Sequence, residues 1–305
     1  MSRRAVSKPL RMLGKPVVTP FRYAWGPSVL SSMLNAGDKK KNERRLDAEY
    51  THVSSMVGWC AREEALLHMK DEVPQERVNG EHYVMWAIGK AAERHVRETL
   101  LAQIGVANAF GVWACKCEKT QRTGFGDATK KCVTCNTTVT QYNEFQAVSN
   151  KWRVRGSIDF LMRKPNGKIA VVEIKSITNS ASANAQKKGF ETLAKPMGDH
   201  IFQATCYVNL LGDPDVCAGH RLEVDDTAII LYVCKDFKWG LRPYKEFHHT
   251  YGPTDEARTL TEFRSAKQVW LAGKGKPLPP RTMCAHIGCS TAVKCPVALE
   301  CFRAK

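Results

Sequence analysis

The segment Gly156–Lys175 constrains the fold most strongly, because it encodes a β-hairpin of defined register. Two apolar runs flank the tripeptide Pro165-Asn166-Gly167. Proline suits the start of a type I turn and glycine suits the left-handed position that follows it, so we expect a three-residue loop. Such a loop pairs residue 164 with residue 168 and places Asp159 directly opposite Glu173. A two-residue Asn-Gly turn would instead place these acids on opposite faces.

The two opposed acids need a compensating positive charge. Side chains directly opposite each other on antiparallel strands have Cβ atoms about 4.5–5.5 Å apart. Two carboxylates at that separation repel by roughly 3 kcal/mol at an effective dielectric constant near 20. A divalent cation with oxygen ligands would offset this repulsion. Alternation along the strand puts Lys175 on the same face as Glu173. Two acids and one amine on one face predict a metal-dependent hydrolytic site; the alternative is a charged strand face exposed to solvent.

The chain contains 12 cysteines, and they are clustered. The first cluster consists of Cys115, Cys117, Cys132 and Cys135. Two close thiolate pairs on separate turns can surround one tetrahedral Zn²⁺ ion. The N-terminus lacks the apolar segment of a secretory signal, so metal binding is favoured over disulfides. We expect a structural zinc ribbon at about residues 113–140, although a single residue separates the first pair instead of the usual two.

The second cluster consists of Cys284, Cys289, Cys295 and Cys301 and follows a glycine- and proline-rich stretch. Its spacing suits paired zinc knuckles poorly, and four thiolates around an iron–sulfur cluster are the alternative. Spacing alone does not choose between the two. Three of the separate cysteines lie in apolar contexts and are predicted to be buried thiols, namely Cys206, Cys217 and Cys234.

The chain is strongly basic, with 46 Lys and Arg against 30 Asp and Glu and a formal net charge of +16. This excess favours a polyanionic partner, most commonly nucleic acid, although a basic surface can also merely limit aggregation. Hydrophobic residues make up 43% and charged residues 25% of the chain, which excludes a wholly disordered or collagen-like protein. No apolar run approaches the roughly 18 residues needed to cross a bilayer. We therefore expect no membrane partner and a cytoplasmic location.

Composition and periodicity divide the chain into a basic flexible arm at residues 1–45 and a folded domain at residues 46–305. Helical periodicity predicts helices over about Ser54–Met69, Glu81–Ile104, His200–Leu211 and Asp255–Ala272. Strands are predicted within Trp152–Ile177 and Thr227–Cys234. Strands flanked by helices indicate a mixed α/β fold, with the ribbon as an insertion.

Several motifs together resemble one enzyme superfamily. The pattern Gly156-x-x-Asp159 followed by Glu173-x-Lys175 is similar to the core of the PD-(D/E)XK nucleases. Five further segments resemble the RecB-type branch of this superfamily: Thr51–Arg62, Gly89–His95, His200–Tyr207, Tyr232–Asp236 and Cys295–Phe302. All occur in order over about residues 50–303. The resemblance implies a restriction-endonuclease-like α/β fold, in which helices flank a mixed sheet.

The resemblance also implies a role for each matched residue. Asp159 and Glu173 would bind Mg²⁺ or Mn²⁺, with His95 and the Ile174 carbonyl as further ligands. Lys175 would orient the attacking water or stabilise charge on the phosphate. Two residues on one helical face, Gln203 and Tyr207, would steady Lys175 or the DNA backbone.

Each of the weaker assignments has a structural alternative. His95 can be a core histidine, Gln203 and Tyr207 can form a packed helix face, and Lys235 can be plain surface charge.

The resemblance further implies a 4Fe–4S cluster, with one cysteine before the nuclease core and three after it. Cys60, Cys295 and Cys301 match this pattern, and either Cys284 or Cys289 would supply the fourth ligand. A rival arrangement uses the four terminal cysteines without Cys60.

The carboxylates by themselves predict phosphodiester hydrolysis, and the resemblance implies a metal-dependent DNA exonuclease of the kind phages carry. It would act on DNA ends or single strands in recombination or replication, in the cytoplasm of a bacterial host. Its expected partners are DNA and a recombination or replication protein, with a homo-oligomer as one option. The alternatives are a structure-selective endonuclease, a non-catalytic DNA-binding iron–sulfur or zinc protein, and an iron–sulfur redox regulator. The number of catalytic ions, one or two, stays open.

Overall fold

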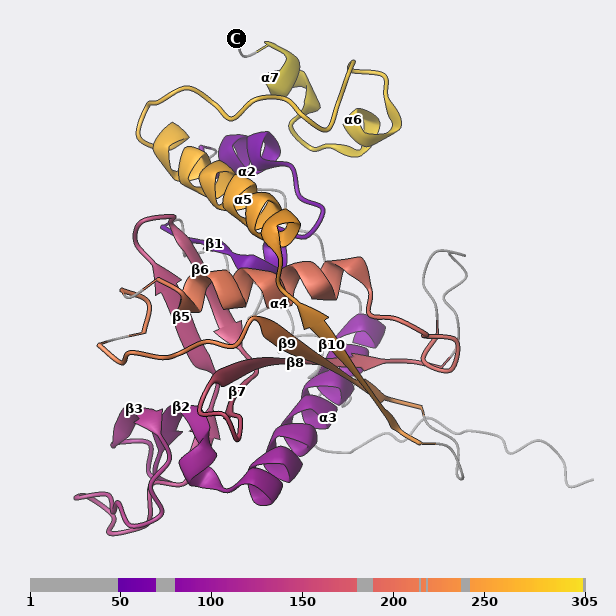
Figure 1. The fold of residues 1–305 in the computed structure, drawn as a ribbon. Coiled ribbons are helices and arrows are strands. Elements are labelled where there is room, and N and C mark those ends of the chain that lie inside the picture. The colour runs from indigo at the N-terminus through magenta and orange to yellow at the C-terminus, as the bar shows by residue number, and fades with distance from the viewer. Residues whose placement is uncertain are drawn as a thin grey trace, which may run out of the picture.

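The computed structural model describes residues 49–69, 80–179, 189–213, 215–217, 219–236 and 242–303. The predicted basic arm, residues 1–45, lies outside the described residues. The described chain has the mixed α/β architecture expected from the sequence, with helices flanking a mixed sheet (Figure 1).

A seven-stranded mixed sheet forms the centre of the molecule, in the order β10-β9-β8-β7-β2-β3, with β4 also paired to β2. Its strands are β2 (Ala109–Ala114), β3 (Gln121–Phe125), β4 (Gln141–Asn143), β7 (Phe160–Arg163), β8 (Ile169–Ile177), β9 (Thr227–Cys234) and β10 (Tyr244–Thr250). Strands β8 and β9 are parallel, and the other pairs are antiparallel. The parallel pair requires a crossover, which helix α4 (Gly198–Leu211) supplies.

A smaller sheet of three strands, in the order β1-β6-β5, stands beside the large one. Its strands are β1 (Thr51–His52), β5 (Phe145–Ser149) and β6 (Val154–Ile158). Along β5 and β6, buried residues alternate with partly or fully exposed ones, so one face of the small sheet packs on the core and the other is open.

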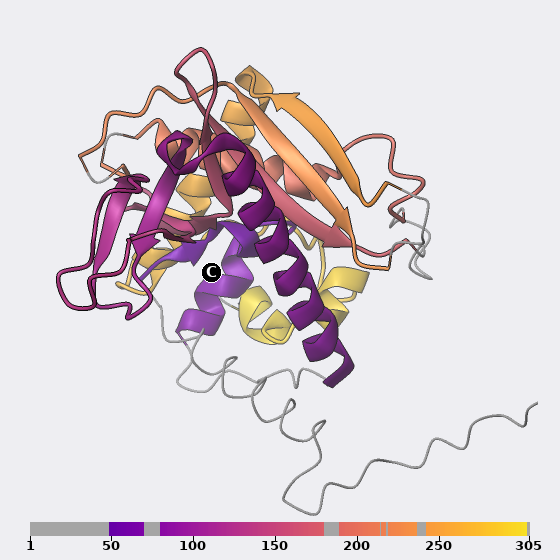
Figure 2. The ribbon, with the colours of Figure 1, turned by 90° about the horizontal axis from the view of Figure 1, so that it is seen from below.

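Helices cover both faces of the large sheet. Helix α4 packs on one face, where Phe202 joins Ile230 in the larger hydrophobic cluster. Helix α3 (Gly80–Ile104) packs on the other, where Val96 joins Val172 and Ile174 (Figure 2). The remaining helices gather above α4 in Figure 1: α2 (Ala61–His68), α5 (Pro253–Ala272), α6 (Ser290–Lys294) and α7 (Ala298–Arg303). Two short 3₁₀ turns, η1 (Val53–Ser55) and η2 (Val106–Asn108), complete the described elements.

The predicted hairpin register is confirmed. The Lys164 N–H donates to the Lys168 carbonyl at 2.8 Å, and Gly167 adopts the left-handed conformation with φ 86°. Phe160 pairs with Val172 by this register, so Asp159 is the next residue opposite Glu173.

Two chain segments pass from one sheet to the other at acidic residues. Asp159 is the single residue between β6 and β7, and Glu144 is the single residue between β4 and β5. Phe145 pairs with Ile158, so Glu144 lies opposite Asp159 when that register is extended by one residue. Asp159 therefore lies where the two sheets separate, between Glu144 on one side and Glu173 on the other.

The predicted helices and strands are largely confirmed, with two kinds of difference. The first predicted helix, Ser54–Met69, is divided into η1 and α2 by a turn that includes Gly58, whose φ is 65°. Strands β1, β2, β4, β5 and β10 and helices α6 and α7 were not predicted. Strand β10 is at the edge of the sheet and much of it is exposed, so its sequence is rich in charged residues and histidine. It therefore lacks the run of apolar residues from which strands such as β8 and β9 were predicted. In the described parts of the chain, no helix has both the length and the hydropathy of a membrane span.

Candidate functional site

The structure brings Asp159, Glu173 and Lys175 together at the boundary between the two sheets. Glu173 is fully buried, and Asp159 is 7% exposed. The Ile174 N–H donates to Asp159 Oδ2 at 2.9 Å, and the Lys175 ammonium lies 2.5 Å from Glu173 Oε1. The two acids and the amine expected from the sequence therefore form one cluster.

One oxygen of the buried Glu173 carboxylate has no protein partner. Glu173 Oε1 faces Lys175, but no hydrogen-bond donor among the described residues reaches Oε2. Buried polar atoms are nearly always paired, because leaving one unpaired costs free energy. The orphaned oxygen indicates that the site is built to receive a further positive or hydrogen-bonding group.

Burial also disturbs the ionisation of this cluster. Desolvation raises the pKa of Asp159 to about 6. Desolvation, followed by repulsion from Asp159, raises the pKa of Glu173 to about 8, even though the ion pair with Lys175 acts in the opposite direction. For Lys175, burial acts to lower the pKa, but attraction to Glu173 and Asp159 outweighs it and the pKa is raised. The cluster therefore carries less negative charge near neutral pH than its two carboxylates would in water.

In the absence of divalent cations, we expect the protein to lose stability as pH rises from about 4.5 to about 8. Over this range the unfolded chain has released the Glu173 proton, whereas the folded chain retains it up to a pKa of about 8. The folded state thus binds more protons, and the free energy of unfolding falls with pH. Chemical denaturation in EDTA at several pH values measures this slope, which Glu173→Gln should flatten. An equally steep slope in that variant would contradict the assignment.

Helix α3 adds two residues that sequence reasoning missed. The Glu93 carboxylate accepts a hydrogen bond from Ser176 at 3.5 Å and lies 3.0 Å from Lys90. Its charge is close enough to help raise the pKa of both Asp159 and Glu173. One turn later, the Arg97 guanidinium lies 2.5 Å from Glu144 Oε1 and 4.0 Å from Asp159 Oδ1. Arg97 therefore bridges the two acids at which the chain changes sheets.

The structure does not bring His95 to the carboxylates. Its side chain is exposed. Two positions along an α-helix correspond to about 200°, so His95 lies on nearly the opposite face from Glu93. Within the motif Gly89–His95, Glu93 is the residue whose charge acts on the two acids, and the exposed His95 lies on another face of the helix.

The Ile174 carbonyl is on the side of β8 that faces Asp159, as a metal ligand at this site would be. In a strand, the N–H and C=O of one residue project to the same side, and the Ile174 N–H points at Asp159. Its carbonyl therefore faces the Asp159 side of β8, beyond the last paired residue of β7, Phe160.

The partly buried Gln203 and the fully buried Tyr207 form a pair on α4. The Gln203 side-chain amide donates to the Tyr207 hydroxyl at 3.0 Å. Burial raises the pKa of Tyr207 well above its usual value, and the charge of Glu173 adds to this effect. A Cβ on Gly156 would lie 2.6 Å from the Tyr207 ring, so glycine at this motif position allows the tyrosine to pack against β6.

Lys235 contacts helix α3. Its ammonium donates to the Met85 carbonyl at 3.4 Å, and a Cβ on Gly89 would lie 3.2 Å from it. The same Cβ would lie 2.8 Å from Ser176 Oγ. Glycine at position 89 therefore permits the close approach of α3 to β8 and to Lys235.

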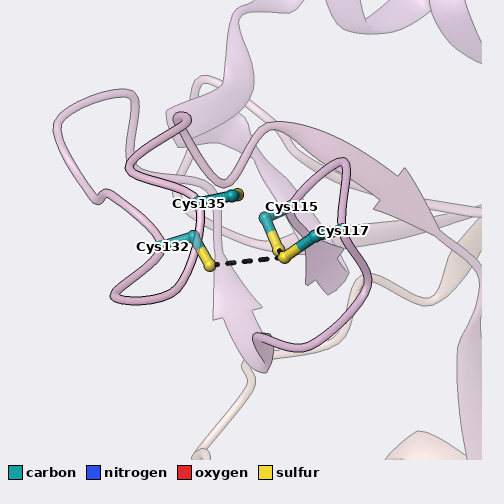
Figure 3. Close-up of side chains that lie close together, drawn as sticks. All are labelled: Cys115, Cys117, Cys132 and Cys135. Atoms are coloured by element: carbon teal, nitrogen blue, oxygen red, sulfur yellow. Dashed lines mark hydrogen bonds between the residues drawn. The ribbon is translucent and has the colours of Figure 1, made fainter.

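The four ribbon cysteines form a second site, at the far end of the molecule from α7 (Figures 1 and 3). Among the described residues, they are the only group of three or more His, Cys, Asp or Glu whose ligand atoms all lie within 4.8 Å of one another: Cys115, Cys117, Cys132 and Cys135. The Sγ atoms of Cys117 and Cys132 are 3.7 Å apart. This cluster could hold a metal ion.

Hydrogen bonds prepare two of these thiols for ionisation. The Thr120 hydroxyl lowers the pKa of Cys132 to about 5, and Thr137 lowers that of Cys135. The neighbouring Cys115 raises the pKa of Cys117 to about 12. Thiolates are the metal-binding form of cysteine, so the lowered pair is suited to metal binding.

Cysteines from both ends of the domain line a third feature, a small cavity between α2 and the C-terminal helices. Four line it directly, namely Cys60, Cys284, Cys295 and Cys301. Cys289 is next to the cavity, where its sulfur accepts a hydrogen bond from Ala292 at the start of α6. The structure therefore joins Cys60, which is distant in sequence, to three of the terminal cysteines. Cys206, Cys217 and Cys234 are buried, as predicted.

No protein-family model matches the chain, and no curated protein matches it. Among solved structures, the crystal structure of SSO0001 is similar over 88% of this chain and 96% of that chain. The identity is 14% and the TM-score is 0.38.

Proposed function

We propose that the protein is a divalent-cation-dependent DNA exonuclease of the PD-(D/E)XK superfamily, with its catalytic centre at Asp159, Glu173 and Lys175. The observation that carries the proposal is the buried pair of opposed carboxylates, one with an unpartnered oxygen, beside a partly buried ammonium group. The strand-helix-strand unit β8-α4-β9, next to the hairpin that presents the acids, fits the restriction-endonuclease-like sheet implied by the sequence motifs.

The residues present fit Mg²⁺ or Mn²⁺. These ions take oxygen ligands, and Mg²⁺ often binds through one or two carboxylates plus water. Asp159 and Glu173 would hold the ion, with the Ile174 carbonyl as a further oxygen ligand. The negative charge of Glu93 acts on Glu173 and would add to the attraction for a cation. A bound divalent cation polarises a phosphoryl oxygen and activates water.

The other groups orient the reaction. Lys175, fixed by its ion pair with Glu173, would direct its ammonium at the attacking water or at the charge that develops on the phosphate. Arg97 holds Glu144 and lies close to Asp159, so it keeps the Asp159 carboxylate in place. Tyr207 and Gln203 support the sheet from the opposite helix. These residues position the reacting groups, which lowers the entropic part of the barrier.

We assign the ribbon cysteines to a structural Zn²⁺ ion. The four sulfurs are close enough for one tetrahedral ion, and all four positions are filled by protein, which is typical of a structural site. We assign the cavity near α7 to a 4Fe–4S cluster held by Cys60, Cys284, Cys295 and Cys301. These four cysteines do not group as tightly as the ribbon set, which suits a cluster of several atoms better than a single ion.

The proposal is tested with purified protein and labelled linear DNA. We expect Mn²⁺ or Mg²⁺ to support phosphodiester hydrolysis and EDTA to abolish it. A circular single strand should resist degradation by an exonuclease, whereas its rapid cleavage would instead favour the endonuclease alternative. Absence of hydrolysis with either ion, on single-stranded and duplex DNA alike, would favour a non-catalytic DNA-binding protein.

A further inference from the structure

A cluster of cations and aromatic rings lies at the end of β6 remote from Asp159. It consists of Tyr50, Lys151, Trp152, Arg153, Trp270 and Lys274, and we call it the basic aromatic cluster. The Arg153 guanidinium lies over the Trp270 ring at 4.2 Å from its centroid, and it is 5.7 Å from the centroid of the Tyr50 ring. The ammonium groups of Lys274 and Lys151 lie over Trp270 and Trp152, at 5.9 and 4.9 Å.

The backbone at this cluster is strained. Arg153 has a φ of 56°, in the left-handed region that residues other than glycine seldom adopt. The turn thereby directs a guanidinium toward the C-terminal end of α5. Strained positions concentrate where a structure presents a side chain for binding. We therefore interpret the conformation of Arg153 as one that presents its guanidinium for binding, in addition to connecting β5 and β6.

The cations of the cluster are not neutralised. In the described part of the chain, Lys151, Arg153 and Lys274 form no ion pair, whereas Lys164 and Lys168 at the turn between β7 and β8 each face an acid. Tyr50, Trp152 and Trp270 are each partly exposed, and Lys151 and Lys274 are exposed. Partly exposed aromatic rings combined with uncompensated cations are features of surfaces that bind single-stranded nucleic acid, by base stacking and phosphate attraction.

The open face of the three-stranded sheet connects this cluster to the catalytic centre. From Arg153, every second residue of β6 is partly exposed, through Arg155 to Ser157. Ser157 accepts a hydrogen bond from the Gln146 amide of the neighbouring strand at 2.7 Å. The next cross-strand position is the pair Glu144 and Asp159, bridged by Arg97. Six residues of strand span about 20 Å, a distance that a few nucleotides of extended single strand can cover.

We propose that the open face of the β1-β6-β5 sheet carries a single DNA strand from the basic aromatic cluster to Asp159. The inference rests on the proposed function and specifies where its substrate lies. Bases stack at Trp270 and Arg153, phosphates follow the cations, and the strand end reaches the carboxylates. Duplex DNA has its bases already stacked, so it gains little from the cluster.

The test compares two cluster variants, Arg153→Gln and Trp270→Leu, with the control Lys168→Gln. The control removes one positive charge, as Arg153→Gln does, but at the turn between β7 and β8. Fluorescence anisotropy in EDTA measures binding of a labelled single-stranded oligonucleotide and of a duplex of equal length. We expect each cluster variant to bind the single strand about tenfold more weakly and the duplex nearly unchanged. Lys168→Gln should bind both as the wild type does. Thermal unfolding monitors the fold of each variant.

Activity on a small substrate separates this inference from the proposed function. Bis(p-nitrophenyl) phosphate is too short to reach the cluster, so its Mn²⁺-dependent hydrolysis should be equal in the wild type and both cluster variants. Weakened strand binding by a protein that hydrolyses neither substrate would support the binding surface and contradict the nuclease. Unchanged single-strand binding in both variants, or an equal loss for strand and duplex, would overturn the surface.

Discussion

The Glu173→Gln variant is expected to hydrolyse DNA at least about 10³-fold more slowly than the wild type. The substitution keeps the shape of the side chain but removes the charge that would hold the cation, and a bound cation contributes several kcal/mol to the stabilisation of the transition state. Each 1.36 kcal/mol corresponds to a tenfold change in rate. Single-turnover hydrolysis of end-labelled DNA at saturating Mn²⁺ measures the loss.

The matched control for this variant is Glu223→Gln. It makes the same chemical change at an exposed position, where the carboxylate is 75% exposed and lies 3.9 Å from Lys168. The control should retain wild-type activity. Because Glu173 is buried at an energetic cost, the glutamine variant should also remain folded. A folded Glu173→Gln protein with activity within a few-fold of the wild type would contradict the assignment of this residue to the catalytic centre.

The second large effect is expected from removal of the ribbon metal. We expect Cys132→Ser to lose one equivalent of zinc per chain and to lower the thermal stability of the protein markedly. Structural zinc supplies on the order of 10 kcal/mol to the folding of small zinc domains at neutral pH. Here the thiolates join two turns on either side of β3, so the segment between β2 and β4 depends on the ion. Metal analysis and differential scanning calorimetry measure the two losses.

Cys301→Ser provides the reciprocal control. It should lose iron and sulfide and retain zinc, since Cys301 lines the cavity near α7 and the ribbon lies elsewhere. Cys132→Ser should retain iron. Loss of both metals in either variant would show that the two cysteine groups do not form separate sites. Full zinc content in Cys132→Ser would show that this residue is not a ligand.

Local sequence signals were sufficient to predict the centre of the site. The loop Pro165-Asn166-Gly167 determines the hairpin register, because proline and glycine each restrict the backbone at one turn position. That register alone places Asp159 opposite Glu173, and strand alternation adds Lys175. The grouping of Cys115, Cys117, Cys132 and Cys135 was predictable for a similar reason, since paired cysteines on short turns permit few arrangements.

The other contacts of the site were not predictable in this way. Glu144 reaches Asp159 only because β5 pairs with β6 in one register, and no turn signal in the sequence specifies that pairing. Arg97 and Glu93 depend on how α3 is rotated against the sheet. The sequence motif included both Glu93 and His95, and only the packing of the helix shows which one faces the strands. Arg153 is similar, because its contact with Trp270 joins residues more than 100 positions apart.

Anomalous X-ray diffraction from crystals grown with Mn²⁺ determines whether Asp159 and Glu173 bind the catalytic cation. We expect a manganese peak between the carboxylates of Asp159 and Glu173, bound by the Glu173 oxygen that lacks a protein partner. A saturating Mn²⁺ concentration that leaves no peak there, with Glu173 still paired only to Lys175, would contradict this assignment.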